Sequence, residues 1–367
     1  MRFLFVGTHY AALRRELVNL GHECEAIDHW ALFCKRGALA AAEACYPEEN
    51  VSMGEVNAYV NDYARKYKPD VLVQWKGWIN DQQYIMPGTI GNLKHDIDCL
   101  TVYWSVDDPD FVGHWQQFLS MLDVWDVSLS CCKASLDTYK RAGVKDPHYF
   151  LPGFDTDWPV DTIEDQRESV DLVIAGHPYA PVHGADMGRA DLALAAKRAG
   201  FSVEVYGPDV EMWAAPRDSL VTGHEELREN YHGWLDHDRV WTAYVRGKVV
   251  LNNHLRKGGG YDPRYAGYCN DKIFQIAGTG GGAMLMDYQP GVSPEVLTEG
   301  DDYIQYRPSL KPSDCVESAM FCLEGLLADD AMRREISRNA RRRTLEEHTW
   351  AHRAKQLIDI CASHGRT

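Results

Sequence analysis

An alternation of short apolar runs and amphipathic helical stretches is the feature that most restricts how this chain can fold. Apolar runs of strand length occur at residues 3–7, 24–28, 69–77, 99–109 and 124–132, and a second series begins near residue 170. Helical periodicity fills most of the intervals between them. Buried strands that alternate with helices predict a parallel sheet covered on both faces.

The two series are separated by residues 151–169, LPGFDTDWPVDTIEDQRES, which are rich in proline and acidic residues. Such a segment predicts a domain boundary. The second series has strands at VDLVIAG, SVEVYG, KVVLNNH and GAMLMD, and the chain after Pro312 is predicted to be helical almost to its end. Two consecutive doubly wound halves bind ligands at the carboxyl ends of their strands, in the cleft between the halves.

Charge and cysteine usage narrow the function classes. The formal net charge of −16 argues against a general binder of nucleic acid or of a membrane surface, because phosphates repel such a surface. The run MRFLFVGTHY is too short for the apolar region of a signal peptide, and the ten cysteines lack the spacing of zinc sites. We therefore expect a cytoplasmic protein with reduced thiols.

Short nucleotide and metal motifs give weak signals. The loop after the first strand, GTHYAAL, has one glycine and so lacks the G-x-G-x-x-G fingerprint of nicotinamide dehydrogenases. The D-x-D motifs at residues 155–157 and 236–238 resemble the motif that holds a metal and a diphosphate in one class of sugar transferases. In a chain with 54 acidic residues this pattern is common, so we interpret both as solvated loop acids and predict no metal site.

Several segments of the C-terminal half occur in an order that carries a family resemblance. They are VDLVIAG…GRADLALAAKRAGFSVEVYG, GWLDHDRVWTAYVRGKVVLNNH, NDKIFQIAG…GGAMLMDYQPGVSPEVLTEGDDYIQY and RRRTLEEHTWAHRAKQL. Together they resemble the nucleotide-binding half of GT-B glycosyltransferases of the CgeB-like, glycosyl transferase family 1 type. In the N-terminal half, PDVLVQWKG, YWSVDDP and YKRAG…YFLPGFD stand at the corresponding places, so the resemblance covers most of the chain.

The resemblance implies a GT-B fold, with two Rossmann-like, doubly wound domains that face a cleft. Residues 1–157 would form the acceptor-binding domain, residues 158–345 the sugar-nucleotide-binding domain, and residues 346–367 a helix that packs back on the N-terminal domain. The implied reaction moves a hexose or pentose from a nucleoside-diphosphate sugar to an acceptor hydroxyl, without a metal or another cofactor.

The resemblance also places the donor contacts. The helix at residues 271–277 offers free N–H groups and a positive dipole end to the diphosphate, and Lys272 and Arg189 are candidate cations beside it. Gln275 stands where the family has a glutamate that holds the ribose hydroxyls, and it keeps hydrogen bonding without the charge. The other candidate donor contacts are Gly176, Gly207, Asn253, His254, Asp287 and Gly291. His254 has a second interpretation, as a hydrogen-bonded core histidine.

The glycine-rich run at residues 278–282 also has two interpretations, a phosphate cradle or a turn. Because this run follows a helix, whereas a phosphate loop precedes one, we predict a helix-to-strand turn and expect the loop at 287–291 to face the donor. Gly267 occupies the position of the first acid in the E-x₇-E signature of retaining enzymes. The sequence therefore does not decide between inversion and retention.

Candidate catalytic residues lie in the N-terminal half. Asp107 and Asp108 directly follow a strand, and a carboxylate there is a candidate base, with His9 as its rival. Asp108 also has an alternative role as a helix cap before Pro109. Candidate acceptor contacts at strand ends are Trp75, Lys76 and Trp104, although most tryptophans simply belong to the core.

Two other function classes stay open. A nucleotide-sugar epimerase would use the same fold and donor without an acceptor. A non-catalytic carbohydrate-binding or coat protein would keep the fold without turnover. The glutamine at position 275, where the family has glutamate, is the sequence feature that most favours this alternative. For a transferase the acceptor is a polysaccharide, a small molecule or a hydroxylated DNA base, and the net charge makes DNA the least favoured.

Overall fold

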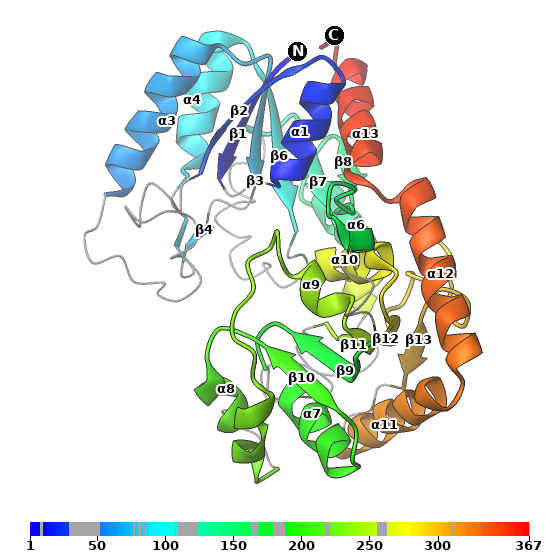
Figure 1. Ribbon diagram of the computed structural model, residues 1–367. Helices are drawn as coiled ribbons and strands as arrows, with labels where there is room; N and C mark the ends of the chain where they lie inside the picture. Colours follow the sequence, from blue (N-terminus) through cyan, green and yellow to red (C-terminus); the bar gives the residue numbers. More distant parts are fainter. Residues whose placement is uncertain are drawn as a thin grey trace. The chain divides into compact units, whose positions relative to one another are not determined.

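The structure is a computed structural model that forms two units (Figure 1). One, the N-unit, contains Met1–Gly153 and Trp350–Thr367, and the other, the C-unit, contains Phe154–Thr349. The described residues are 1–7, 10–28, 52–75, 78–79, 82–83, 85–106, 108, 124–162, 168–178, 188–216, 221–254, 263–307, 309 and 311–366.

The N-unit is built on a six-stranded sheet of order β2-β1-β3-β6-β7-β8 in which every pair is parallel. Its strands are β1 (Arg2–Gly7), β2 (Glu23–Ile27), β3 (Val71–Trp75), β6 (Leu100–Ser105), β7 (Val127–Ser130) and β8 (Pro147–Tyr149). A separate hairpin pairs β4 (Trp78–Ile79) with β5 (Gln82–Gln83). The helices are α1 (Ala11–Asn19), α3 (Met53–Tyr67), α4 (Pro87–Ile97), α6 (Lys133–Arg141) and α13 (Trp350–Ser363).

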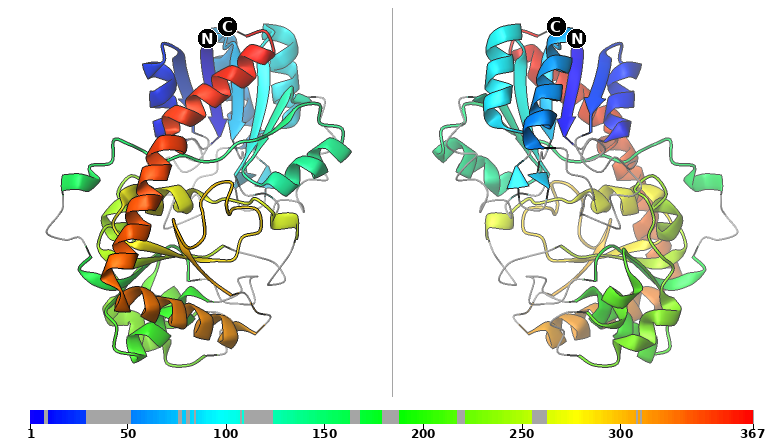
Figure 2. Two further views of the ribbon diagram at one scale, coloured as in Figure 1. Left: turned by 90° about the vertical axis from the view of Figure 1, so that its right-hand side faces the viewer. Right: turned by 90° about the vertical axis from the view of Figure 1, so that its left-hand side faces the viewer.

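Alternation along the N-unit strands divides its core into two layers. In β1, Phe3 and Phe5 pack into the layer that contains residues of α1 and α13, while Leu4 and Val6 pack into the layer of α3 and α4. Both faces of β1 are therefore apolar, as a parallel sheet covered on both sides requires. Figure 2 shows α13, the last helix of the chain, lying across this sheet in the same layer as α1.

The C-unit is built on a five-stranded parallel sheet of order β10-β9-β11-β12-β13. Its strands are β9 (Val170–Ala175), β10 (Val203–Tyr206), β11 (Gly247–Asn252), β12 (Ala283–Asp287) and β13 (Ile304–Tyr306). Its α-helices are α7 (Arg189–Arg198), α8 (Val210–Ala214), α9 (Trp241–Tyr244), α10 (Asp271–Thr279), α11 (Pro312–Ala328) and α12 (Asp330–Glu347). Short 3₁₀ helices are η3 (Val160–Thr162), η6 (His224–Asn230) and η7 (Pro263–Tyr265).

The glycine-rich run forms the turn from α10 to β12, as predicted. Gly280 ends the helix in the left-handed region, with φ of 58°. A Cβ on Gly281 would overlap the backbone at Val245, and one on Gly282 would lie 2.9 Å from the carbonyl oxygen of Lys248. The run therefore lets the chain turn tightly against the start of β11, and its small residues serve packing.

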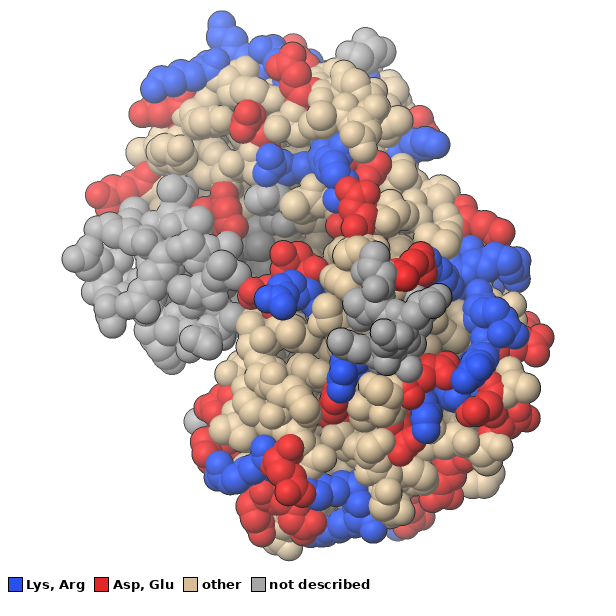
Figure 3. Space-filling model, in the orientation of Figure 1, with Lys and Arg blue, Asp and Glu red and all other residues tan. Residues whose placement is uncertain are grey.

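Acidic and basic side chains are interspersed over the coloured part of the face in Figure 3. Three exposed arginines, Arg334, Arg338 and Arg342, follow one another at intervals of four along α12. Two of them pair with acids: Arg334 with Glu168 at 3.1 Å and Arg342 with Glu346 at 3.6 Å. Within the described part of the chain, no helix has the length and apolar character needed to cross a membrane.

Candidate functional site

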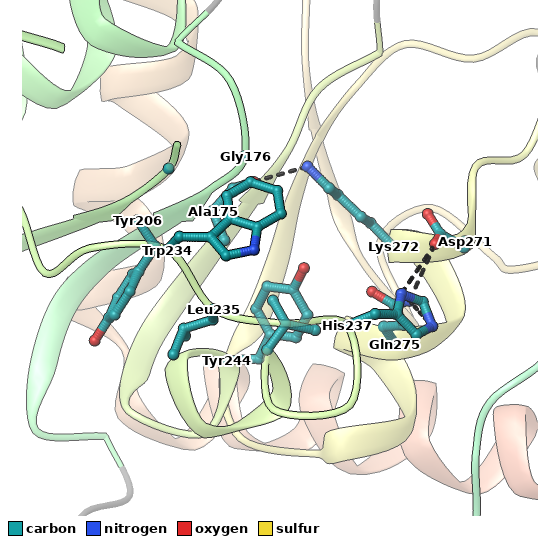
Figure 4. A pocket seen from close by; sticks show the side chains of 12 residues that line it. Ala175, Gly176, Tyr206, Trp234, Leu235, His237, Tyr244, Asp271, Lys272 and Gln275 are labelled. Carbon is teal, nitrogen blue, oxygen red and sulfur yellow. Dashed lines mark hydrogen bonds and ion pairs between the residues drawn. The ribbon is translucent and has the colours of Figure 1, made fainter. Parts of the chain in front are cut away.

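A pocket of about 140 Å³ lies at the carboxyl edge of the C-unit sheet (Figure 4). Strands β9 and β10 end in this pocket, and the first turns of α10 form another wall. The lining residues are Ala175, Gly176, Tyr206, Gly207, Trp234, Leu235, His237, Val240, Tyr244, Asp271, Lys272 and Gln275. This is the edge at which parallel α/β sheets bind ligands.

Two cations converge on Gly176, directly after β9. The Lys272 ammonium donates to the carbonyl oxygen of Ala175 at 2.7 Å, and Arg189 Nη1 donates to that of His177 at 3.0 Å. Gly176 has φ of 125°, and a Cβ there would lie 2.7 Å from Arg189 Nη1 and would overlap the Lys272 ammonium. Only glycine leaves room for both positive groups at this point.

The electrostatics of this point favour an anion. Burial, and then the neighbouring charge of Arg189, lower the pKa of Lys272 to about 7, and Asp271 opposes this effect in part. No described carboxylate forms an ion pair with the Lys272 ammonium. An anion placed between the two cations would relieve their mutual repulsion and would meet the N-terminus of α10.

Residues at the end of β11 hold the N-terminus of α10 and the guanidinium of Arg189 in place. Asn270 caps α10 by accepting from the backbone N–H of Ile273 at 3.2 Å, and it exchanges amide hydrogen bonds of 3.1 and 3.2 Å with Asn252. The next residue, Asn253, accepts from Arg189 Nε through its side chain and from Nη2 through its carbonyl oxygen at 2.8 Å. The predicted contacts Arg189 and Asn253 thus lie together, with Asn253 positioning the guanidinium.

Gln275 lies in the pocket wall beside an acid. Its amide nitrogen donates to Asp271 Oδ2 at 3.1 Å and lies 3.4 Å from both ring nitrogens of His237 (Figure 4). Asp271 is the one acidic residue among those that line the pocket in the described chain. The pocket wall therefore carries one carboxylate, one helical turn before Gln275.

Asp271, Trp234, His237 and Tyr244 are among the pocket residues that were not singled out from the sequence. Asp271 and Gln275 face each other because residues four apart on a helix are neighbours, so Asp271 had a detectable signal. Trp234 and His237 come from a stretch without regular structure and had none. Tyr244 is fully buried, and no described residue pairs with its hydroxyl, which leaves that group available to a ligand.

The remaining donor candidates lie on neighbouring strand ends of the same unit. His254 and Asp287 form a buried pair, with Nδ1 to Oδ1 at 2.8 Å. Gly207 approaches the carbonyl oxygen of Gly176 closely, since a Cβ there would lie 2.7 Å from it. Gly291, with φ of 77°, packs against Gly267, whose N–H donates to the carbonyl oxygen of Pro290 at 2.6 Å.

Asp108 occupies a closed environment in the N-unit. It is 1% exposed, and its carboxylate accepts from the hydroxyls of Ser105 at 2.7 Å, Ser130 at 2.6 Å and Tyr139 at 3.1 Å. A carboxylate with three internal donors is satisfied without a substrate. This environment favours a role in holding β6, β7 and α6 together, whereas a base that meets an acceptor must be accessible.

Trp75 and Trp104 belong to an aromatic cluster under α1 and α13. Tyr10 stacks on Trp75 with ring centroids 4.6 Å apart, and Phe150 meets Trp104 edge to face at 5.0 Å. Trp350, the first residue of α13, lies 6.2 Å from Trp104. With exposures of 8% and 1%, the two indoles have the core role given above as the alternative to acceptor contact. His9, Lys76 and Asp107 lie outside the described residues.

The two D-x-D motifs differ in their local contacts. Asp155 accepts the backbone N–H of Asp157 at 3.0 Å, which closes a turn. Asp236 and Asp238 flank His237, the pocket residue. Among the residues that the structure describes, no group of three or more histidine, cysteine, aspartate or glutamate side chains is arranged to hold a metal.

Residues 189–359 match the family model described as glycosyl transferase-like. The matched residues, fewer than half of the chain, are thus similar to a glycosyl transferase-like domain. They include every donor candidate except Gly176 and every pocket residue except Ala175 and Gly176. No curated protein sequence matches the chain significantly.

Solved structures show the same fold over nearly the whole chain. A glycosyltransferase from Rickettsia africae has a TM-score of 0.61 at 9% identity, covering 99% of this chain and 98% of that one. An α,α-trehalose-phosphate synthase from Burkholderia xenovorans has a TM-score of 0.57 at 11% identity, with coverage of 98% and 100%. A UDP-GlcNAc 2-epimerase from Neisseria meningitidis, bound to UDP-GlcNAc, has a TM-score of 0.56 at 11% identity, with coverage of 99% and 100%. The predicted fold class, two Rossmann-like domains of the GT-B type, is confirmed.

Proposed function

We propose that this protein transfers a sugar from a nucleoside-diphosphate sugar to an acceptor hydroxyl, and that the C-unit binds the donor. The observation that carries the proposal is the convergence of Lys272 and Arg189 on Gly176, at the carboxyl edge of β9 and next to the N-terminus of α10. Two cations and a helix end in one place match the charge of a diphosphate.

In this proposal the nucleoside occupies the adjoining pocket. Figure 4 shows the rings of Trp234 and Tyr244 in the pocket wall between Tyr206 and Lys272. Aromatic rings suit a base, and the carboxylate of Asp271, held by Gln275, suits the hydroxyls of a ribose. The pocket therefore offers one surface for each part of a nucleoside.

The same groups have a task in the reaction. When the glycosidic bond to the donor breaks, negative charge develops on the departing nucleoside diphosphate. Lys272, Arg189 and the N–H groups of α10 stabilise that charge from fixed positions, which lowers the barrier without a need for a divalent ion. We accordingly propose a metal-independent, cytoplasmic enzyme of the CgeB-like group with no cofactor, and assign the acceptor to the N-unit.

The proposal is tested by titrating UDP, GDP, ADP and TDP and their sugars into the protein, with and without EDTA, by thermal shift and calorimetry. We expect one nucleotide to bind, with no effect of EDTA, and Lys272→Met to weaken it about tenfold or more through loss of one charge-assisted contact. The matched control is Lys248→Met, because Lys248 pairs with Asp171 at 2.7 Å and does not line the pocket. Equal effects of the two substitutions, or binding of no nucleotide, would contradict the proposal.

Epimerisation of a nucleotide sugar is the second candidate, favoured by the likeness to the Neisseria meningitidis enzyme. The two functions make different products from the same donor. An epimerase converts the nucleotide sugar with no acceptor present, and nuclear magnetic resonance would detect the second sugar epimer. Release of the nucleoside diphosphate only when an acceptor extract is added would support transfer.

A further inference from the structure

A buried histidine–aspartate pair closes the ends of β11 and β12. His254 Nδ1 lies 2.8 Å from Asp287 Oδ1, and the same oxygen accepts the backbone N–H of His254 at 3.1 Å. The second carboxylate oxygen of Asp287 accepts from the Gln289 amide at 3.0 Å. The two residues are 2% and 1% exposed.

The pair leaves one polar atom without a partner. A carboxylate only accepts hydrogen bonds, so Asp287 fixes the proton of His254 on Nδ1 and turns Nε2 away from itself. Nε2 is buried, and no described residue lies within hydrogen-bonding distance of it. Tyr268 meets the ring edge to face, with centroids 5.4 Å apart, and so restrains its plane. A buried polar atom with no partner is costly and indicates a missing one, here a ligand or a water molecule.

The order of the strands in the sheet indicates which group of a bound donor would reach His254 Nε2. Along the carboxyl edge the strands follow one another as β10, β9, β11 and β12, spaced about 4.8 Å apart. The pocket lies at the ends of β10 and β9, the cations meet at Gly176 after β9, and the histidine pair lies at the ends of β11 and β12. Pocket, cations and pair thus repeat the order of nucleoside, diphosphate and sugar in the donor.

Asn253 connects the site of the two cations with the histidine–aspartate pair. Asn253, the neighbour of His254, holds Arg189 through two hydrogen bonds. We propose that His254 Nε2 hydrogen-bonds a hydroxyl or carbonyl group of the donor sugar, and that Asp287 is a positioning residue that acts through the ring. This inference rests on the proposed function, because it takes the group between the cations to be the diphosphate.

The test compares a bare nucleoside diphosphate with its sugar conjugate in the full-length protein. Calorimetry with UDP and UDP-glucose, GDP and GDP-mannose, ADP and ADP-glucose, and TDP and TDP-glucose gives a dissociation constant for each member of the pair that binds. In His254→Phe, which keeps an aromatic ring and removes the hydrogen bonds of both ring nitrogens, we expect the sugar conjugate to bind about tenfold more weakly and the bare diphosphate within twofold of wild type.

A second buried pair supplies the control. His224 Nε2 lies 2.8 Å from Asp191 Oδ1, both side chains are about as buried as those of the first pair, and neither residue lines the pocket. His224→Phe removes the same kind of contact from the same unit. It should lower the melting temperature and leave the ratio of the two dissociation constants unchanged.

The role of Asp287 is read from a double-mutant cycle. Asp287→Asn removes the charge that orients the ring, so the ratio of the dissociation constants of the sugar conjugate and the bare diphosphate should rise about threefold. Adding Asp287→Asn to His254→Phe should change this ratio no further. Equal weakening of both ligands in either variant, or an unchanged ratio in His254→Phe, would overturn the inference and assign Nε2 to a buried water. Failure of every nucleoside diphosphate to bind the wild type would instead count against the proposed function itself.

Discussion

The two units have the same parallel architecture, yet their strand ends use polar and aromatic side chains differently. In the N-unit, Asp108 is enclosed by three hydroxyls, and Trp104 is packed under two helices. In the C-unit, Lys272 shares its site with a second cation, and the Tyr244 hydroxyl and His254 Nε2 have no described partner. Trp75 Nε1 and Trp104 Nε1 in the N-unit also lack a described partner, so an unsatisfied atom at a strand end marks a candidate binding site only where a pocket or a charged group lies beside it.

The largest expected effect is a loss of stability in the N-unit, where the contacts of the strand-end acid Asp108 are already satisfied. Asp108→Ala leaves the hydroxyls of Ser105, Ser130 and Tyr139 without their acceptor, and we expect the free energy of unfolding of the N-unit to fall by about 3 kcal/mol. Denaturant unfolding measures this change, and Asp62→Ala, on the exposed side of α3, is the control. Donor affinity should be unchanged.

The opposite outcome is equally informative. If Asp108→Ala left stability intact and abolished sugar transfer, the carboxylate would be reaching an acceptor, and the catalytic role predicted from the sequence would hold. The two units would then use their strand ends in the same way.

The next effect concerns the space at Gly176. Gly176→Ala places a methyl group where Lys272 and Arg189 meet, so nucleotide affinity should fall by more than tenfold as the cations are displaced. Gly200→Ala is a matched control, because Gly200 has φ of 91° and open space around its Cβ position. Both substitutions carry backbone strain of about 1 kcal/mol, but only the first should change the dissociation constant measured by calorimetry.

A smaller effect should appear in the pH dependence of binding. With a pKa of about 7, Lys272 is charged below that pH and loses its proton above it. The diphosphate binds the charged form, so the affinity for a nucleotide sugar, whose phosphates stay ionised throughout, should fall from pH 6.5 to 8.5 by at most tenfold per unit. Lys272→Arg keeps its charge and should flatten the profile; a profile with the same slope in both proteins would exclude Lys272 as its origin.

The alternating strands could be predicted because their burial appears in the sequence as apolar runs. The helix α4, whose glycines and polar residues hide its periodicity, and the three-residue strand β13 could not. Lys272 and Arg189 were identified separately, but their meeting at Gly176 depends on the pairing of β9 with β11, which no local pattern encodes. Trp75 and Trp104 were placed at strand ends. The resemblance implied a terminal helix that packs on the N-terminal domain, but not that this helix, α13, covers these two indoles.

The smallest expected effect would sharpen the comparison inside the C-unit. Gln275→Glu introduces the glutamate that the resembled family has at this position, whereas in this protein the Gln275 amide donates to Asp271 at 3.1 Å. A glutamate would set two carboxylates at that distance, so the pKa of one would rise and the pair would share a proton. We therefore expect nucleotide affinity near pH 7.5 to fall about threefold and to recover below pH 6, as the shared proton is restored. Gln275→Glu with Asp271→Asn should bind like the wild type, because the single charge has then moved one helical turn. A gain in affinity from Gln275→Glu alone would show that Asp271 does not supply the charge that the family's glutamate provides.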